Sequence, residues 1–449
     1  MASNLRQPGV FGQLCWDTYT LVLLGFPDQP GSTRDQVLAT LDSSAKQVLK
    51  AFPFLAGQVV VKGRTTTNSG QYEIVPYQAH QDGTPVRRKD CTELCPSYQE
   101  ILDADAPFSM LDGSVLCPMK GMGFAYGPET ELPVFIVQAN FVKGGIILCF
   151  ASMHNALDMN GQGIVIKMFA QAGRGETFDP SVVETGNRDA DTIVPLLKPD
   201  ETMLPHENMR RPSTLNPSGP PPSMSAPWKY WRFSAEKLEK LKQIASSGRT
   251  WVSTNDAINA LFIQRLTAAR VEAGLVSPTE DIHLYRAVDG RSALRPPVDP
   301  GYLGHLVVVA ETSWDRAQEA IDSSLADASL NIRDSLKQVD DFFVRSLATL
   351  IDSTEDKSTI FYGVNSKVGR DFLISSWAQL HWLSSCDFGP GLGSPDFVRR
   401  ANLEDLPILA YIMPKDKKGN MHIGASLPPQ DFDLLVKDAK WREYADLVG

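Results

Sequence analysis

The sequence lacks the long apolar stretches that mark membrane and secreted proteins. No apolar run approaches the roughly 20 residues that a membrane-spanning helix needs, and Leu21–Leu24 is far too short. The opening residues Met1–Arg6 contain no apolar core of a signal peptide. We therefore expect the protein to act in the cytoplasm, away from membranes.

Positive charge and clustered cysteines are also scarce. The net charge of −10 argues against nucleic acid or an anionic membrane surface as the main partner. The six cysteines are scattered, and only Cys91 and Cys95 stand close together. This spacing fits neither a disulfide framework nor a zinc site, so we expect reduced thiols and no metal. A hydrolase is disfavoured because no G-x-S-x-G elbow occurs.

The length of the chain and one proline-rich segment predict its organisation. A chain of 449 residues exceeds one ordinary core, which predicts two domains. Residues 194–227 contain nine prolines and cannot form an ordinary helix or central strand. We expect an N-terminal domain over residues 1–193, a crossover linker over 194–227 and a C-terminal domain over 228–449.

Helical and strand-like patterns mix on both sides of this predicted linker. Helical periodicity covers residues 32–52, 233–244 and 254–273, with further helices within 317–350. Two hairpins are expected, one joining residues 59–61 to 72–75 and one joining 406–413 to 421–427.

A histidine and an aspartate stand four residues apart after a predicted strand. The apolar run Ile146–Phe150 predicts a buried strand, and residues 163–172 predict a helix. His154 therefore lies where a strand ends and a loop begins, a rigid support suited to a catalytic group. Because the pKa of histidine lies near neutral pH, His154 can take a proton from a hydroxyl and pass it on. Asp158 would act on the imidazole or anchor the loop.

The HxxxD pattern alone leaves two interpretations open. A histidine at the end of a strand is often a hydrogen-bonded structural residue rather than a base. Of the seven histidines, only His154 has an aspartate four residues later, which narrows the choice of candidate.

A glycine-rich segment, Asp387–Gly393, forms the second motif. Its three glycines alternate around Pro390, a composition that no regular element tolerates, so we predict a fixed loop. Residues 372–377 before it predict a strand. A dinucleotide-binding G-x-G-x-x-G loop is excluded because the spacing differs and no helix follows.

Together these two motifs resemble the HxxxD and DFGWG signatures of the BAHD acyltransferases. The chain is most similar to the fungal branch of that family, the trichothecene 3-O-acetyltransferases, and the resemblance runs from end to end. Further matching blocks are Ala51–Gly57, Ser253–Ala257, Val288–Ser292, Pro296–Pro297 with Gly301–Gly304, and Met413–Gly449. Several blocks in the family's order are far more specific than any one of them.

Three positions depart from the pattern of the plant members. Pro390 stands where those members have tryptophan, His305 replaces an asparagine, and Met159 with Asn160 separates Asp158 from the glycine that follows. The first and third departures fit the trichothecene branch, so we interpret them as branch markers.

The resemblance implies an α+β fold of two chloramphenicol-acetyltransferase-like domains with mixed sheets and a channel between them. It implies an O-acyltransferase that uses acyl-CoA, above all acetyl-CoA, as co-substrate and has no permanently bound cofactor. The acceptor would be a small alcohol of fungal secondary metabolism, such as a trichothecene-like terpenoid. His154 would deprotonate the hydroxyl, which attacks the thioester without a covalent enzyme intermediate. The family also suggests a monomer.

The same resemblance predicts an ion pair between Asp158 and an arginine elsewhere in the chain. In the family the aspartate points away from the histidine and pairs with an arginine, which matches Arg291 here. Such a buried pair would hold the loop that carries His154. The alternative is that Arg291 is a surface charge beside a turn.

The resemblance also implies residues that contact the substrates. It places Ser375 and Trp377 against the reaction intermediate and the acceptor, where a hydroxyl and an indole N–H can donate hydrogen bonds; an ordinary half-buried strand is the alternative. Ser253 and Thr254 begin a predicted helix whose N–H groups can attract CoA phosphates, while Ser253 also fits a capping box.

Two more segments have structural interpretations. Lys415–Lys418 could meet the 3′-phosphate of CoA, but a solvated hairpin tip is the more ordinary interpretation. The loop with Asp387, Gly389 and Gly391 is expected to lie far from the channel and hold the domain interface, as it does in the family.

Rival functions remain at this point. A condensation domain of a peptide synthetase shares the fold, but it carries a second histidine where this chain has Met153, and we expect no attached carrier-protein domain. Acylation of another polyketide or alkaloid alcohol, or of an amine, stays open, as does a silent ligand-binding relative.

Overall fold

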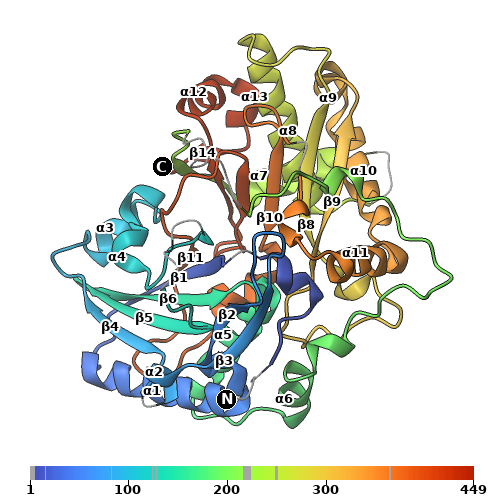
Figure 1. Ribbon diagram of the computed structural model, residues 1–449. Coiled ribbons are helices and arrows are strands. Elements are labelled where there is room, and N and C mark those ends of the chain that lie inside the picture. Colours follow the sequence, from blue (N-terminus) through green and yellow to red (C-terminus); the bar gives the residue numbers. More distant parts are fainter. Residues whose placement is uncertain are drawn as a thin grey trace.

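The computed structural model describes residues 6–15, 17–81, 83–123, 126, 130–215, 224–247, 251–363 and 366–449. Two mixed β-sheets with helices packed on them make up the two halves of the molecule (Figure 1). This arrangement confirms the expected α+β class.

The N-terminal half is built on a five-stranded sheet. Its strands, in spatial order, are β11 (Phe397–Arg399), β1 (Tyr19–Pro27), β6 (Gly145–Met153), β5 (Phe135–Val142) and β4 (Val86–Asp90). Strands β4 and β5 run parallel, whereas the other neighbouring pairs of this sheet are antiparallel. Every residue of β5 and β6 is buried, which explains why both strands are mostly apolar rather than alternating, with Gln138 and Asn140 of β5 hydrogen-bonded in the interior.

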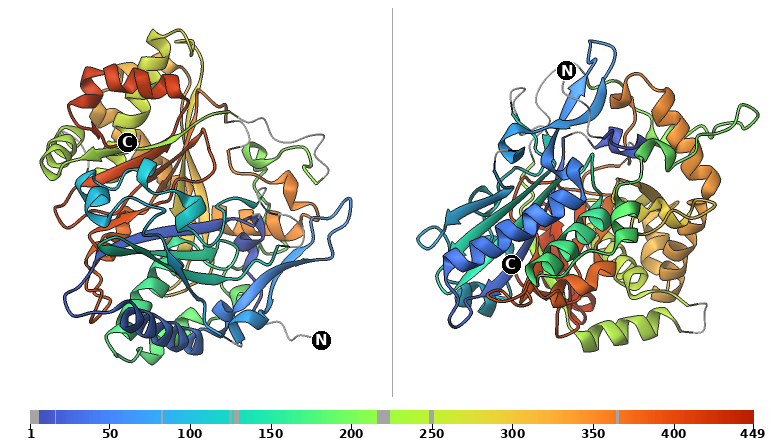
Figure 2. Two further views of the ribbon diagram at one scale, coloured as in Figure 1. Left: turned by 90° about the vertical axis from the view of Figure 1, so that its left-hand side faces the viewer. Right: turned by 90° about the horizontal axis from the view of Figure 1, so that it is seen from below.

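Helices and a hairpin complete this half. They are α1 (Arg34–Ala51), α2 (Gln78–Gln81), α3 (Tyr98–Asp103), α4 (Gly113–Leu116), α5 (Met159–Gly173), α6 (Pro180–Gly186) and the hairpin of β2 (Gly57–Lys62) with β3 (Gln71–Pro76). Viewed from below, α1 and α5 lie side by side (Figure 2).

The C-terminal half contains a seven-stranded sheet. Its order is β14 (Asp446–Leu447), β7 (Trp228–Phe233), β13 (Met421–Ser426), β12 (Leu409–Ile412), β10 (Phe372–Ser376), β8 (Ile282–Asp289) and β9 (Val307–Trp314). Strand β10 runs parallel to both of its neighbours. The helices are α7 (Ala235–Ala245), α8 (Thr254–Glu272), α9 (Ala317–Asp322), α10 (Leu325–Ser335), α11 (Asp341–Ser353), α12 (Pro429–Lys437) and α13 (Ala439–Arg442).

Most of the predicted elements are confirmed. Both hairpins form, and the helix expected from residue 32 starts after the Thr33 cap. The helix predicted from residue 163 is wrong at its start, because α5 begins at Met159 with Asp158 as its cap. Gly161 and Gly163 weaken the helical pattern there, so the first turn gives little sequence signal.

One strand crosses from one half to the other. Although β11 comes from the C-terminal part of the chain, it pairs with β1 and forms the edge of the N-terminal sheet. Of the proposed linker, residues 216–223 lie outside the described residues, and the domain boundaries stay a prediction. Across the described ranges, no helix is long and apolar enough to span a membrane.

Candidate active site

His154 directly follows β6 and lies where the two halves of the molecule meet. The His154 backbone N–H donates to the carbonyl of Thr18 at 2.8 Å, which ties the residue to the start of β1. Its Nδ1 lies 2.9 Å from the carbonyl oxygen of Leu157. Because a carbonyl can only accept, Nδ1 carries the proton and Nε2 keeps its lone pair. The local backbone thus selects the tautomer that a general base needs.

The imidazole is held neutral by its surroundings. Burial lowers the pKa of His154 below 6.5, and the positive charge of Arg400 acts in the same direction. The hydrogen bond to Leu157 and the charge of Asp158 oppose this shift without reversing it. A half-buried neutral histidine at pH 7 is ready to accept a proton.

Asp158 faces away from the histidine and toward Arg291. Its carboxylate accepts from both Nη atoms of Arg291, at 2.7 and 3.1 Å, and from the backbone N–H groups of Gly161 and Leu306. The two side chains are 1% and 2% exposed. Although burial opposes ionisation, Arg291 keeps the pKa of Asp158 below its ordinary value.

Arg291 is satisfied on every side. Besides Asp158, it donates to the carbonyls of Tyr302 and Gly304 and to the carboxylate of Asp289. Since Asp158 also caps α5, the pair joins the histidine loop to the segment after β8. The geometry suits an anchor rather than a proton relay.

His305 lies next to His154, although the sequence assigned His305 no role. Its ring meets that of His154 edge to face, with centroids 4.6 Å apart. Burial and the nearby His154 lower the pKa of His305 to about 3, so it stays neutral. The thiol of Cys15 lies 3.5 Å from its Nδ1.

A cavity of about 520 Å³ opens between the two halves. It is lined by the first residues of α5, the start of α8, the end of β8 and the end of β10. The cavity brings together five site residues predicted from the sequence: Asp158, Ser253, Thr254, Ser375 and Trp377. His154 does not line this cavity, but Asp158 and Met159, which follow its loop, do.

The start of α8 is capped from within. The Ser253 hydroxyl donates to the Asp256 carboxylate at 2.7 Å, and the Asp256 N–H donates back to it at 3.1 Å. Asp256 is buried beside Arg286 and Arg333. The capping box therefore occupies Ser253 and neutralises part of the helix dipole, so Thr254 is the better placed hydroxyl for a ligand in the cavity.

The end of β10 supplies donors to the same cavity. Ser375 is half-buried, and the Trp377 indole is buried with its ring edge-to-face against Tyr411 at 5.4 Å. The exposed Lys415 also lines the cavity, whereas Lys417 pairs with Asp396 at 3.4 Å. Lys415 is thus the lysine of that cluster that faces the cavity.

The Asp387 loop packs on the N-terminal half, away from this cavity. Phe388 is buried against Phe26 and Phe150, and the Asp387 backbone carbonyl accepts from Arg174. The exposed Asp387 carboxylate accepts from the Gly389 N–H, at 2.8 Å. The loop leads into β11 and carries the chain between the halves.

Arg400 is the residue that sequence reasoning missed at this centre. It follows β11, is buried and lies with its guanidinium 3.9 Å from the ring centroid of Tyr411. Nothing in the pair Arg399–Arg400 marks one as different from the other, because the contrast arises only from long-range packing.

Comparisons with known proteins agree with this geometry. A model of the Transferase family matches residues 123–441, and one of the trichothecene 3-O-acetyltransferase-like N-terminal domain matches 18–173. The O-acyltransferase pigD of Monascus ruber is 34% identical, with 100% of each chain covered. Trichothecene 3-O-acetyltransferase TRI101 of Fusarium sporotrichioides is 31% identical, over 96% of this chain and 94% of that protein.

A solved structure extends the match to three dimensions. The crystal structure of F. graminearum TRI101 with coenzyme A and T-2 mycotoxin superposes with a TM-score of 0.90 at 30% identity, covering 99% of each chain. The expected family is therefore confirmed: this chain belongs to the Transferase family, the BAHD-type acyltransferases.

Proposed function

We propose that this protein is an O-acyltransferase that moves an acyl group, in the first instance acetyl, from CoA to a hydroxyl of a fungal secondary metabolite. The observation that carries the proposal is the His154 ring, whose Nδ1–H is bound to the Leu157 carbonyl so that Nε2 is left as the base. Relatives named O-acyltransferase and O-acetyltransferase support the reaction class.

His154 acts as the general base in direct transfer. Nε2 takes the proton of the acceptor hydroxyl as its oxygen attacks the thioester carbonyl carbon. The tetrahedral intermediate then collapses, the carbon–sulfur bond breaks, and the proton on Nε2 passes to the CoA thiolate. No enzyme nucleophile takes part, because holding both substrates together supplies much of the acceleration.

Asp158 and Arg291 position the base rather than share its proton. Their buried ion pair fixes the loop between β6 and α5, and with it the Leu157 carbonyl that orients the ring. Asp387, Gly389 and Gly391 hold the loop that docks on the N-terminal half and take no part in the chemistry.

The cavity between the halves accommodates the donor. Thr254 and Asn255 at the start of α8 line it, and Lys415 supplies a positive charge. Ser375 and Trp377 also line the cavity, where a hydroxyl and an indole N–H can donate to the developing oxyanion. Related enzymes crystallised with coenzyme A support CoA as the co-substrate.

The acceptor is a small alcohol, and a trichothecene-like terpenoid is the first to test. Structures of TRI101 with T-2 mycotoxin and with deoxynivalenol support this choice. We further propose that the enzyme works as a monomer in the cytoplasm.

Thiol release from acetyl-CoA against a panel of fungal alcohols tests the proposal. Wild type should release CoA and give an acetylated product by mass, whereas His154→Ala should do neither. Thr254→Ala should weaken CoA binding, and Lys418→Ala, at the exposed hairpin tip, is the control that should leave it unchanged. CoA binding without transfer to any alcohol would contradict the acceptor class, and absence of both would favour a silent relative.

A further inference from the structure

Strand β11 ends at Arg399 and Arg400 follows it, and both arginines are buried. Arg399 is 3% exposed and Arg400 is 7% exposed. Successive side chains of an extended segment point to opposite sides, so the two guanidinium groups enter different surroundings. The contrast between these surroundings leads to an inference about the acceptor.

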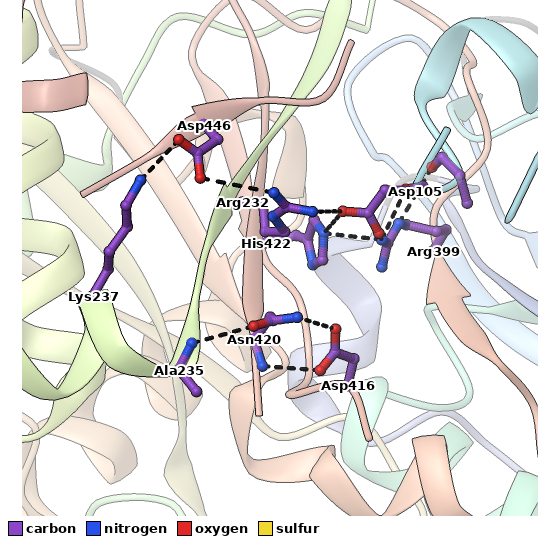
Figure 3. Close-up of polar contacts among 10 residues, drawn as sticks. Asp105, Arg232, Ala235, Lys237, Arg399, Asp416, Asn420, His422 and Asp446 are labelled. Carbon is purple, nitrogen blue, oxygen red and sulfur yellow. Dashed lines mark hydrogen bonds and ion pairs between the residues drawn. The ribbon is translucent and has the colours of Figure 1, made fainter. Parts of the chain in front are cut away.

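Arg399 is fully paired. It donates to the Asp105 carboxylate at 2.9 Å and to the carbonyls of Asp105 and Ala106 at 3.0 and 3.3 Å. Figure 3 shows the Asp105 carboxylate in contact with Arg399, Arg232 and His422. The Nε2 atom of His422 lies 2.9 Å from an oxygen of this carboxylate. This network joins the halves and leaves Arg399 no capacity for a ligand.

Arg400 has no such partners. Its backbone N–H donates to the Tyr230 hydroxyl, but within the described ranges its side chain meets no acceptor and no carboxylate, and Nε is buried without any partner. The guanidinium stacks on Tyr411 at 3.9 Å and lies 5.5 Å from the Trp228 ring centroid. Aromatic faces offset part of the loss of water, but they leave the in-plane N–H donors unused.

This unpaired cation lies beside the proposed catalytic groups. Tyr411 pairs in register with Ser375 on the neighbouring strand, and its ring contacts Trp377. Arg400, stacked on Tyr411, therefore lies one side chain away from two residues that line the cavity. The positive charge of Arg400 also lowers the pKa of His154, which places it within electrostatic reach of the base.

Of the three guanidinium nitrogens of Arg400, only Nε is buried without a partner among the described residues, so the two unpaired Nη atoms keep contact with solvent and can meet a ligand. A planar fork of N–H donors matches the two oxygens of a carboxylate. We propose that Arg400 binds an anionic oxygen of the acceptor, a carboxylate in the first instance, and so favours acidic hydroxy compounds over a neutral terpenoid alcohol. This inference rests on the proposed acyl transfer, because it concerns the acceptor of that reaction. Its test measures binding and does not need turnover.

Three probes of nearly equal size separate charge from shape: benzoate, benzamide and benzyl alcohol. We expect wild type to bind benzoate at least about tenfold more tightly than benzamide or benzyl alcohol in calorimetric titrations at pH 7. Arg400→Met should remove that preference, while Arg400→Lys should keep part of it, since lysine retains the charge without the fork. Arg188→Met, which removes an exposed arginine, serves as the matched control and should keep the full preference.

A melting curve separates ligand binding from a structural role. Because Arg400 has no side-chain hydrogen-bond or ion-pair partner among the described residues, Arg400→Met should melt at the wild-type temperature or above it. Equal affinity of wild type for all three probes, or a benzoate preference that survives in Arg400→Met, would overturn the proposal. Titration of the same proteins with CoA tests the proposed transferase function separately. If wild type does not bind CoA, that function is contradicted, while the preference for benzoate can still be measured.

Discussion

The two signature loops of this protein are held in opposite ways. The histidine loop depends on a buried ion pair, Asp158 with Arg291, in which both charges are satisfied by hydrogen bonds. The loop at Asp387 depends on apolar packing of Phe388 and on glycines with positive φ, while its aspartate is exposed. The two signature aspartates therefore have different structural roles: Asp158 is a buried anchor, and Asp387 stabilises a local turn.

Removing the His154 imidazole should lower the rate more than any other single substitution in the two loops, and it should distinguish the histidine loop from the Asp387 loop most clearly. We expect His154→Ala to lower kcat by about 10²–10⁴-fold, because general base catalysis contributes on that scale. The melting temperature should change little. Near-full thiol release by this variant would remove His154 from its proposed role.

Breaking the ion pair should cost stability rather than only rate. Arg291→Met should lower the free energy of unfolding by about 3–5 kcal/mol, because it leaves the buried Asp158 carboxylate without its cation. Asp158→Ala should cost less, because Arg291 keeps the Asp289 carboxylate at 2.8 Å as a partner. Denaturant titration measures the loss. A double-mutant cycle without coupling between the two positions would contradict the pair as an anchor.

The glycine loop should respond to backbone changes instead. Gly389 has φ +85°, and an added Cβ would lie 2.4 Å from the Gly173 carbonyl oxygen. We expect Gly389→Ala to lower the free energy of unfolding by roughly 1–3 kcal/mol, measured by denaturant titration. Gly393→Ala is the matched control, since φ is +68° there with open space around it, and it should cost less.

The Asp387 side chain should matter least for stability. Asp387→Ala removes one exposed hydrogen bond to the Gly389 N–H, so we expect a loss of about 1 kcal/mol and an unchanged kcat. Parallel melting and rate measurements check both. An inactive variant of wild-type stability would mean that this loop, too, takes part in chemistry.

The pH dependence of kcat/KM should give the smallest difference between the two loops. Since burial and Arg400 hold the pKa of His154 below 6.5 and the base must be unprotonated, kcat/KM should fall only as pH drops below about 6.5. In Arg400→Met this acidic limb should move to higher pH, because a positive neighbour is gone; the remaining charge near the ring is Asp158, which acts upward. Asp387→Ala should leave the limb in place.

Local patterns predicted much of the fold and only part of the site. The apolar run before His154 and the hairpins around β2 and β13 carry their signal in consecutive residues. The partnership of Arg291 with Asp158 came from family resemblance alone, because the two lie 133 positions apart. The difference between Arg399 and Arg400 was invisible, since it depends on which partners, Asp105 or Tyr411, the fold brings to each.

The crossing strand β11 also bears on how the protein is made. During synthesis β1 can pair with β6 early, yet its other edge stays open until residues 397–399 leave the ribosome. At about 5–20 residues per second that delay lasts for tens of seconds, during which an apolar strand offers unpaired N–H and C=O groups to other chains. Late pairing of β11 therefore makes the edge of β1 the part of the N-terminal sheet most open to wrong pairing before the chain is complete.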